Sequence, residues 1–311
     1  MSQEGPINST VATGIITARK MVSHICQGRR HAPEKNQDFA ISGTSTNRLF
    51  DYLVVADGHD GRGGNYVNKY LRDLDWDVLL EDTDFMDKIY DGVQELGNTS
   101  GCGSTLTIAI ITAHQAEIYW IGDSQCRVYK NLEEIWASKN HDQHNEEEIQ
   151  RLNDGPSSTP ETEPWRPLGE VGRQDGWRIE LLSQTEITME PSPYFVFNAS
   201  NKTNMTHSLG HNGLSGKFWS EEVIDFTDHF DYKIVVGSDG LWDMVHYKDY
   251  PFMASRDTGC EEMLQLTNNR WKQEWKYYCP TIPRNEQKGD VMAIPDGEED
   301  DTSVAVWYRG I

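Results

Sequence analysis

The sequence from residue 57 reads Asp57-Gly58-His59-Asp60-Gly61-Arg62-Gly63-Gly64, and it directly follows an apolar run, residues 50–56. The apolar run predicts a buried β-strand, and the glycines predict a tight turn after it. A carboxylate at the end of such a strand lies at the rim of a sheet, where a charged ligand has room beside it. The stretch therefore predicts a cation site at the end of this strand.

The same arrangement recurs along the chain. Five predicted strand ends carry aspartate, and these residues are Asp38, Asp57, Asp123, Asp239 and the pair Asp300-Asp301. Clusters of carboxylates without Cys or His select hard cations such as Mg²⁺ or Mn²⁺. For any single position an ordinary turn aspartate is the simpler explanation, but the repetition favours a shared site for two ions.

Six segments in this order resemble the metal-dependent Ser/Thr protein phosphatases, the PPM or type 2C family. They are Asn36-Gln37-Asp38, Asp57-Gly58-His59-Asp60-Gly61, Gly103-Ser104-Thr105, Gly122-Asp123-Ser124, Asp239-Gly240-Leu241-Trp242-Asp243 and Asp300-Asp301-Thr302-Ser303. Two further segments are similar but altered, namely Asn140-His141 with Glu148 and Arg151, and Met205-Thr206-His207-Ser208-Leu209-Gly210-His211. The resemblance covers residues from about 20 to 309.

Strand runs in pairs, with two helices grouped after the first of them, favour an α+β fold over alternating βαβ units. The resemblance specifies an αββα sandwich, with two central antiparallel β-sheets flanked by helix pairs. We expect a polar N-terminal tail over residues 1–13 and a single phosphatase domain over residues 14–311.

Apolar periodicity predicts the following elements: helices over residues 66–79, 85–96 and 260–278, a strand meander over residues 105–112, 117–121 and 127–130, and a surface loop over residues 153–176.

The resemblance also implies roles for the acidic residues. Asp57 would bridge two Mg²⁺ or Mn²⁺ ions, and the backbone carbonyl of Gly58 would bind one of them. Asp38, Asp239 and Asp300 would complete the ligand set, partly through water. In relatives with a third, weaker ion, Asp243 would join Asp239; there this chain offers Asn140, an amide in place of a carboxylate.

His59 is the candidate general acid for the leaving Ser or Thr oxygen, since histidine titrates in the required range. The alternative is a loop histidine that orders water near the ions. Many family members carry Arg five residues before the first Asp, where this chain has Pro33, so Arg29, Arg30 or Lys35 would have to meet the substrate phosphate, with Lys35 and Arg30 as the candidates. For each of them, a surface cation is the simpler explanation.

The formal net charge of -22 argues against nucleic-acid and anionic-membrane partners. The five cysteines are scattered without a Cys-x-x-Cys pair, and no segment approaches 18 consecutive apolar residues. These features favour an intracellular protein, cytoplasmic or nuclear, and we expect a monomer whose partner is a phosphoprotein substrate.

The predicted function is Mg²⁺/Mn²⁺-dependent hydrolysis of phosphoserine and phosphothreonine in proteins, by a water molecule that bridges the ions. One alternative is a pseudophosphatase, a binding module with the same fold, because Asn140, His207 and His211 depart from the family pattern. A second alternative is a hydrolase of small phosphate compounds.

Overall fold

The computed structural model describes residues 22–26, 37–47, 49–60, 66–97, 99, 102–142, 145–148, 150, 166–167, 177–180, 195–196, 202–203, 205–211, 217–278, 284–286, 288–294 and 300–310. The expected N-terminal tail and nearly all of the expected loop over residues 153–176 lie outside this part of the chain.

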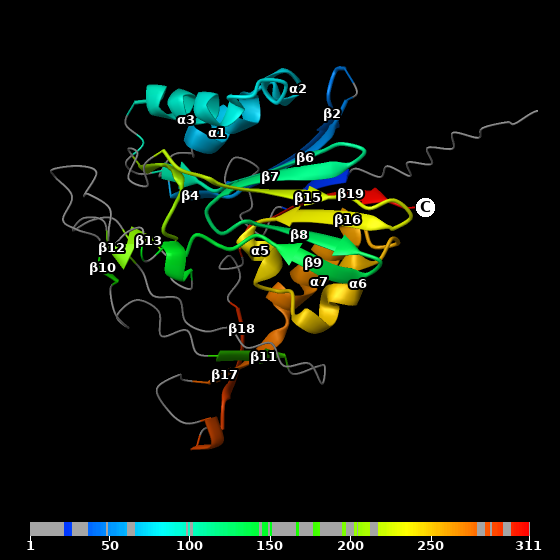
Figure 1. Ribbon diagram of the computed structural model, residues 1–311. Helices are drawn as coiled ribbons and strands as arrows, with labels where there is room; N and C mark the ends of the chain where they lie inside the picture. Colours follow the sequence, from blue (N-terminus) through cyan, green and yellow to red (C-terminus); the bar gives the residue numbers. More distant parts are fainter. Residues whose placement is uncertain are drawn as a thin grey trace, which may run out of the picture.

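Two antiparallel five-stranded sheets form the centre of the molecule (Figure 1). The first has the order β1-β19-β16-β8-β9, with β1 Val22–Cys26, β8 Gln125–Lys130, β9 Glu133–Ala137, β16 Tyr232–Gly237 and β19 Thr302–Arg309. The second has the order β15-β7-β6-β3-β2, with β2 Phe39–Thr44, β3 Asp51–Ala56, β6 Leu106–Ile111, β7 Gln115–Ile121 and β15 Ser220–Asp225.

Helices cover the outer faces of both sheets (Figure 1). Over the second sheet lie α1 Tyr66–Asp73, α2 Trp76–Leu79 and α3 Phe85–Glu95. On the side of the first sheet lie α5 Asp239–Trp242, η3 Tyr247–Asp249, α6 Tyr250–Ala254 and α7 Cys260–Lys272. The expected αββα sandwich is confirmed.

Three small sheets lie outside the two layers. They comprise β4 Gly58–Asp60, β5 Cys102–Ser104 and β14 Leu209–Gly210; β11 Trp177–Glu180, β17 Glu274–Tyr278 and β18 Asp290–Ala293; and β10 Arg166–Pro167, β12 Phe195–Val196 and β13 Lys202–Thr203. A further short helix, η4, spans Arg284–Glu286.

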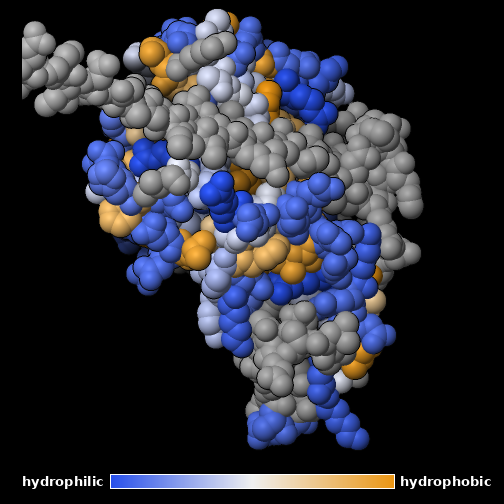
Figure 2. All heavy atoms as spheres, turned by 90° about the vertical axis from the view of Figure 1, so that its right-hand side faces the viewer, coloured by the Kyte–Doolittle hydropathy of each residue, from blue (hydrophilic) through white to orange (hydrophobic). Residues whose placement is uncertain are grey.

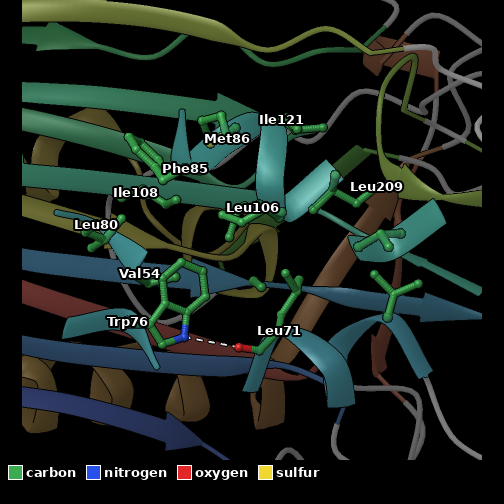
Figure 3. Close-up of a cluster of buried hydrophobic side chains, with 14 of the residues drawn as sticks. Val54, Leu71, Trp76, Leu80, Phe85, Met86, Leu106, Ile108, Ile121 and Leu209 are labelled. Carbon is green, nitrogen blue, oxygen red and sulfur yellow. Dashed lines mark hydrogen bonds between the residues drawn. The ribbon is translucent and has the colours of Figure 1, made fainter. Parts of the chain in front are cut away.

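The layers follow from the period-two alternation of the central strands. In β3, Leu53 and Val55 pack between the sheets, whereas Val54 packs under α1 and α3. Figure 3 shows this second cluster, in which Trp76 fills the space beside Val54 and donates its indole N–H to the carbonyl of Leu71. Both faces of the strand are therefore buried, which explains the unbroken apolar run in the sequence.

The expectation of one continuous helix over residues 66–79 is wrong, because the segment forms two helices, α1 and α2. Asp75 caps the second piece, since its side chain accepts from the N–H of Val78 at 3.4 Å. A capping aspartate competes with a continuous helix, and the break leaves Val78 59% exposed, although its spacing had placed it on the apolar face.

Two other expectations need correction. The expected meander is not continuous, because β6 and β7 pair with each other whereas β8 crosses to the first sheet and pairs with β16. The helix expected over residues 260–278 ends at Lys272, and Trp275 lies in β17. Trp275 is fully buried there, and packing of its ring against Trp271 and Met244 determines its environment more than helical spacing does.

Hydrophilic side chains dominate the face shown in Figure 2, and the hydrophobic ones form small separate groups. Among the described residues, no helix has both the length and the apolar character that a membrane crossing needs. Cys102, Cys126 and Cys260 are buried free thiols.

Lys233 is a charged residue inside the first sheet. Only 2% of it is exposed, and its ammonium group donates to the carbonyls of Ser255 at 2.7 Å and Thr258 at 2.6 Å. Burial lowers the pKa of Lys233 from 10.5 to about 8, and Cys260 and Glu262 oppose the shift. Because the unfolded chain binds this proton more tightly, stability must rise with pH between these two values and stay constant below them.

We therefore predict that the native protein gains about 3 kcal/mol in free energy of unfolding between pH 8 and pH 10.5 relative to Lys233→Met. Chemical denaturation across this pH range measures the difference, and Lys248→Met, at an exposed position of η3, serves as the control. Parallel pH profiles for native protein and Lys233→Met would contradict the prediction.

Candidate metal centre

The strand pairing brings four of the predicted aspartates to one edge of the sandwich. Asp38 precedes β2 and Asp57 follows β3, and these antiparallel strands pair Phe39 with Ala56 at that edge. Asp239 follows β16 and Asp300 precedes β19, which pair in the same way in the other sheet. Each sheet thus contributes two carboxylates to the rim between them.

Electrostatics show that these carboxylates lie close enough to interact strongly. Burial, followed by the charges of Asp301 and Asp239, raises the pKa of Asp38 from 3.8 to about 7, although hydrogen bonds with Asp57 and Ser238 oppose the shift. Carboxylates that share a small volume of low dielectric favour protonation unless a cation offsets their charge.

Asp57 and Asp300 show the same effect. Burial raises the pKa of Asp57 well above its usual range, and Asp38, Asp239 and Asp300 raise it further. Burial raises the pKa of Asp300 as well, with Asp239 and Asp38 as the next causes. All four predicted aspartates therefore belong to one electrostatic cluster.

The sequence analysis counted Asp123 among the aspartates at strand ends but gave it no role as a metal ligand. Asp123 is 7% exposed and lies in the turn between β7 and β8. Burial raises its pKa well above the usual range, and Asp239, Asp142 and Asp243 follow as causes. Its position at a strand end was the available signal, since it is the same signal that identified the other four.

Asp51, at the opposite end of β3 from Asp57, provides a contrast. Its carboxylate accepts from the hydroxyl of Thr44 at 2.8 Å and from the indole of Trp307 at 3.1 Å. Asp123 Oδ1 and Asp239 Oδ1 are also buried but have no hydrogen-bond partner among the described residues. A buried carboxylate oxygen without a donor is costly, and a cation would satisfy it.

Backbone and hydroxyl groups hold Asp57 in place. Its N–H donates to Thr105 Oγ1 at 2.9 Å, and its carbonyl accepts from the N–H of Thr105 at 2.8 Å. Thr105 Oγ1 also lies 2.6 Å from Ser124 Oγ, in the turn that carries Asp123. Two of the recognised motifs therefore serve to fix a third.

A second set of contacts fixes Asp239 and Asp300. Ser238 and Ser303 exchange hydrogen bonds at 3.1 and 3.0 Å, and the N–H of Gln37 donates to Asp301 Oδ2 at 3.1 Å. A side chain on Gly240 would begin 2.1 Å from the carbonyl oxygen of Asp301, so only glycine permits this approach. Both carboxylates of the pair therefore bind backbone, since Asp300 Oδ1 in turn accepts from the N–H of Asp301 at 2.9 Å.

His59 and Gly58 lie on β4, directly after Asp57, and β4 pairs with β5. Arg72 on α1, which the sequence analysis did not single out, donates to the carbonyl of Asp38 at 3.2 Å and is otherwise exposed. Lys35 and Arg30, the expected phosphate-binding cations, lie outside the described residues.

The two altered segments pack together beside the cluster. Thr206 Oγ1 donates to Glu148 Oε2 at 2.9 Å, and His207 Nδ1 lies 3.8 Å from the same oxygen, with all three residues buried. His141 accepts from the N–H of Gly122 at 3.0 Å. Asn140 Oδ1 is buried and has no hydrogen-bond partner in the described part of the chain.

In the part of the chain that the structure describes, no group of three or more His, Cys, Asp or Glu side chains forms a ready-made metal site. Asp57, Asp123, Asp239 and Asp300 also form no ion pair with a described Lys or Arg. Within the described residues, protons, mutual hydrogen bonds or an added cation are therefore what can compensate their negative charges.

Comparison with known proteins agrees with this arrangement. Residues 24–163 match the family model described as Protein phosphatase 2C, a region that contains Asp38, Asp57 and Asp123 and ends before Asp239. Among curated proteins of Oryza sativa subsp. japonica, "Probable protein phosphatase 2C 45" is 24% identical over 198 residues, which cover 60% of each chain. "Probable protein phosphatase 2C 59" is 25% identical over 286 residues, covering 88% of this chain and 78% of the relative.

Solved structures share the fold. A C. elegans sex determining protein superimposes with a TM-score of 0.56 at 15% identity, covering 93% of this chain and 64% of its own. The S. agalactiae serine/threonine phosphatase gives a TM-score of 0.53 at 17% identity, covering 94% of this chain and 100% of its own.

The charge cluster predicts an effect on stability that needs no assay of activity. Without divalent ions, Asp239→Asn should raise the free energy of unfolding by about 1 kcal/mol, because it removes repulsion and leaves the fold intact. With Mn²⁺ the native protein should become more stable than Asp239→Asn, since the ion stabilises the native protein more than the variant.

Thermal melts with and without Mn²⁺ measure both effects. Asp225→Asn, at the exposed end of β15, is the matched control. It should change neither the stability without divalent ions nor the stabilisation by Mn²⁺. Equal Mn²⁺ stabilisation of native protein and Asp239→Asn would rule out Asp239 as part of a cation site.

Proposed function

We propose that the chain, which is similar to the PPM (type 2C) phosphatases, is a metal-dependent phosphatase that hydrolyses phosphoserine and phosphothreonine in proteins. One observation carries the proposal, namely the convergence of Asp38, Asp57, Asp239 and Asp300 from both sheets at one rim. We further propose an intracellular monomer.

The residues at the rim fit Mg²⁺ or Mn²⁺. The donors are carboxylate oxygens with unsatisfied charge, which are the ligands that hard cations take. Asp57 would bridge two ions, the carbonyl of Gly58 would bind one, and Asp38, Asp239 and Asp300 would complete the set together with water. When bound, such ions activate a water molecule and neutralise the phosphoryl oxygens.

Other residues would act on the substrate. His59, two residues after Asp57, would protonate the leaving oxygen of serine or threonine. A cation would bind the phosphate, and the candidates are Lys35 and Arg30, with Arg72 added because it is held beside Asp38.

Asp123, Asp142 and Asp243 form a second acidic group that shares Asp239 with the first. We propose that a further ion would bind here weakly, because Asn140 brings no charge. Asp142 is the candidate to replace the missing carboxylate, since its charge acts on Asp123.

The alternative is a pseudophosphatase that binds but does not turn over. Its support comes from the departures at Asn140, His207 and His211. Against it, His207 packs in a buried contact with Glu148, so its change from the family pattern concerns packing more than chemistry. A scaffold would also have no need for four carboxylates whose repulsion costs stability.

The experiment that tests the proposal compares native protein with Asp57→Asn and Asp225→Asn on phosphopeptides, an aryl phosphate and small phosphate metabolites with Mn²⁺. Asp57→Asn should reduce kcat by orders of magnitude, because it removes a charge shared by two ions. Asp225→Asn should match the native protein. Native protein that is folded yet inactive on every substrate would favour the pseudophosphatase, and activity confined to metabolites would favour the small-phosphate hydrolase.

A second experiment tests the acid. His59→Gln should slow hydrolysis of phosphoserine peptides about 100-fold while an aryl phosphate, whose leaving oxygen hardly needs a proton, loses much less. Steady-state kinetics on both substrates measure the two ratios. Equal losses would reduce His59 to a role in ordering water.

A further inference from the structure

The small sheet β14-β5-β4 brings the segment 205–211 beside His59. In the register of this sheet, His59 lies opposite Gly103 on β5, and Gly103 lies opposite Gly210 on β14. His211 follows Gly210 directly, so one bare backbone position separates the two histidines across the sheet.

The two imidazole rings are in contact. Their centroids are 4.7 Å apart with an interplanar angle of 41°, within the range of favourable ring pairs. Only 8% of His211 is exposed, and its Nδ1 lies 2.8 Å from Ser208 Oγ, which fixes the orientation of the ring.

Gly103 makes room for this contact. A Cβ at this position would lie 2.4 Å from His211 Cε1 and 2.6 Å from its Nδ1. Any larger residue on β5 would therefore push the ring of His211 away from His59.

The backbone of the segment is shaped for the same contact. Gly210 has φ of +87° and His211 has φ of +48°, so two successive residues adopt the left-handed conformation. This conformation is uncommon for a residue other than glycine, and it directs the His211 side chain back over Gly103. Residues held in this way cluster at functional sites.

We propose that His211 is a positioning residue for His59. Its ring forms one wall of the space that His59 occupies, and so holds the acid in the orientation from which it reaches the leaving oxygen. The aspartate that the family pattern places here has no ring to form that wall. The inference rests on the proposed function, because it needs His59 to act as the acid.

General acids tolerate little displacement, so loss of the wall should act on the proton transfer and not on phosphate binding. The effect should consequently appear in kcat for substrates that need a proton, with KM unchanged and aryl phosphate hydrolysis nearly unchanged.

The test uses His211→Asn, His211→Phe and the control His229→Asn. Asparagine tolerates the left-handed backbone but lacks a ring, whereas phenylalanine keeps a ring and loses the contact with Ser208. His229 is an exposed histidine whose φ of +68° is also left-handed, so its replacement reports the backbone effect alone. Thermal melts establish the folded fraction to which each rate is normalised.

With Mn²⁺, His211→Asn should lower kcat on a phosphoserine peptide about tenfold or more and barely change an aryl phosphate. His211→Phe should retain most of the activity, and His229→Asn should match the native protein. Equal losses of His211→Asn on both substrates, a native-like His211→Asn, or a His211→Phe as slow as His211→Asn would each overturn the inference. A native protein that hydrolyses neither substrate would instead overturn the proposed function. The proposed catalytic role of the contact between His59 and His211 would then fail as well.

Discussion

Repulsion between buried carboxylates is the constraint on which the rest of the structure depends. The charges of Asp38 and Asp300 raise the pKa of Asp57, the charge of Asp38 also raises that of Asp300, and Asp239 raises the pKa of all three. A fold that gathers these charges must resist their tendency to separate. The sandwich does so because hydrophobic layers pack against both sheets and hold them rigid. The positions of the strand ends are therefore fixed by the backbone and the core, independently of the acidic side chains.

Hydrogen bonds then join one strand end to the next. Thr105 links Asp57 to the turn of Asp123 through Ser124, and Ser238 links the Asp239 turn to Ser303. These residues carry no charge, so they hold the acids without neutralising them. The polar motif residues between the aspartates are therefore explained as a frame that keeps negative charge in place for a cation.

The sequence predicted the parts of the site that depend on local pattern, and it missed those that depend on tertiary contact. Strand ends with aspartate were readable because apolar alternation stops abruptly at the acid, as at Asp57 and Asp239. The break at Asp75 and the strand around Trp275 were not readable, since a cap and a buried indole overrode helical spacing. Asp123 carried the readable signal, but its place in the acidic group follows only from the effect of Asp239, Asp142 and Asp243 on its pKa.

His211 shows how a departure from a family pattern can be a gain instead of a loss. By sequence alone, histidine in place of aspartate weakened the case for catalysis. In the structure its ring contacts the proposed acid, its nitrogen bonds Ser208, and Gly103 is bare where that ring lies. Three separate features agree with a histidine at this position. A module that had merely lost its activity would have no physical reason to keep an uncommon backbone conformation, a glycine and a buried hydrogen bond around a single substituted side chain.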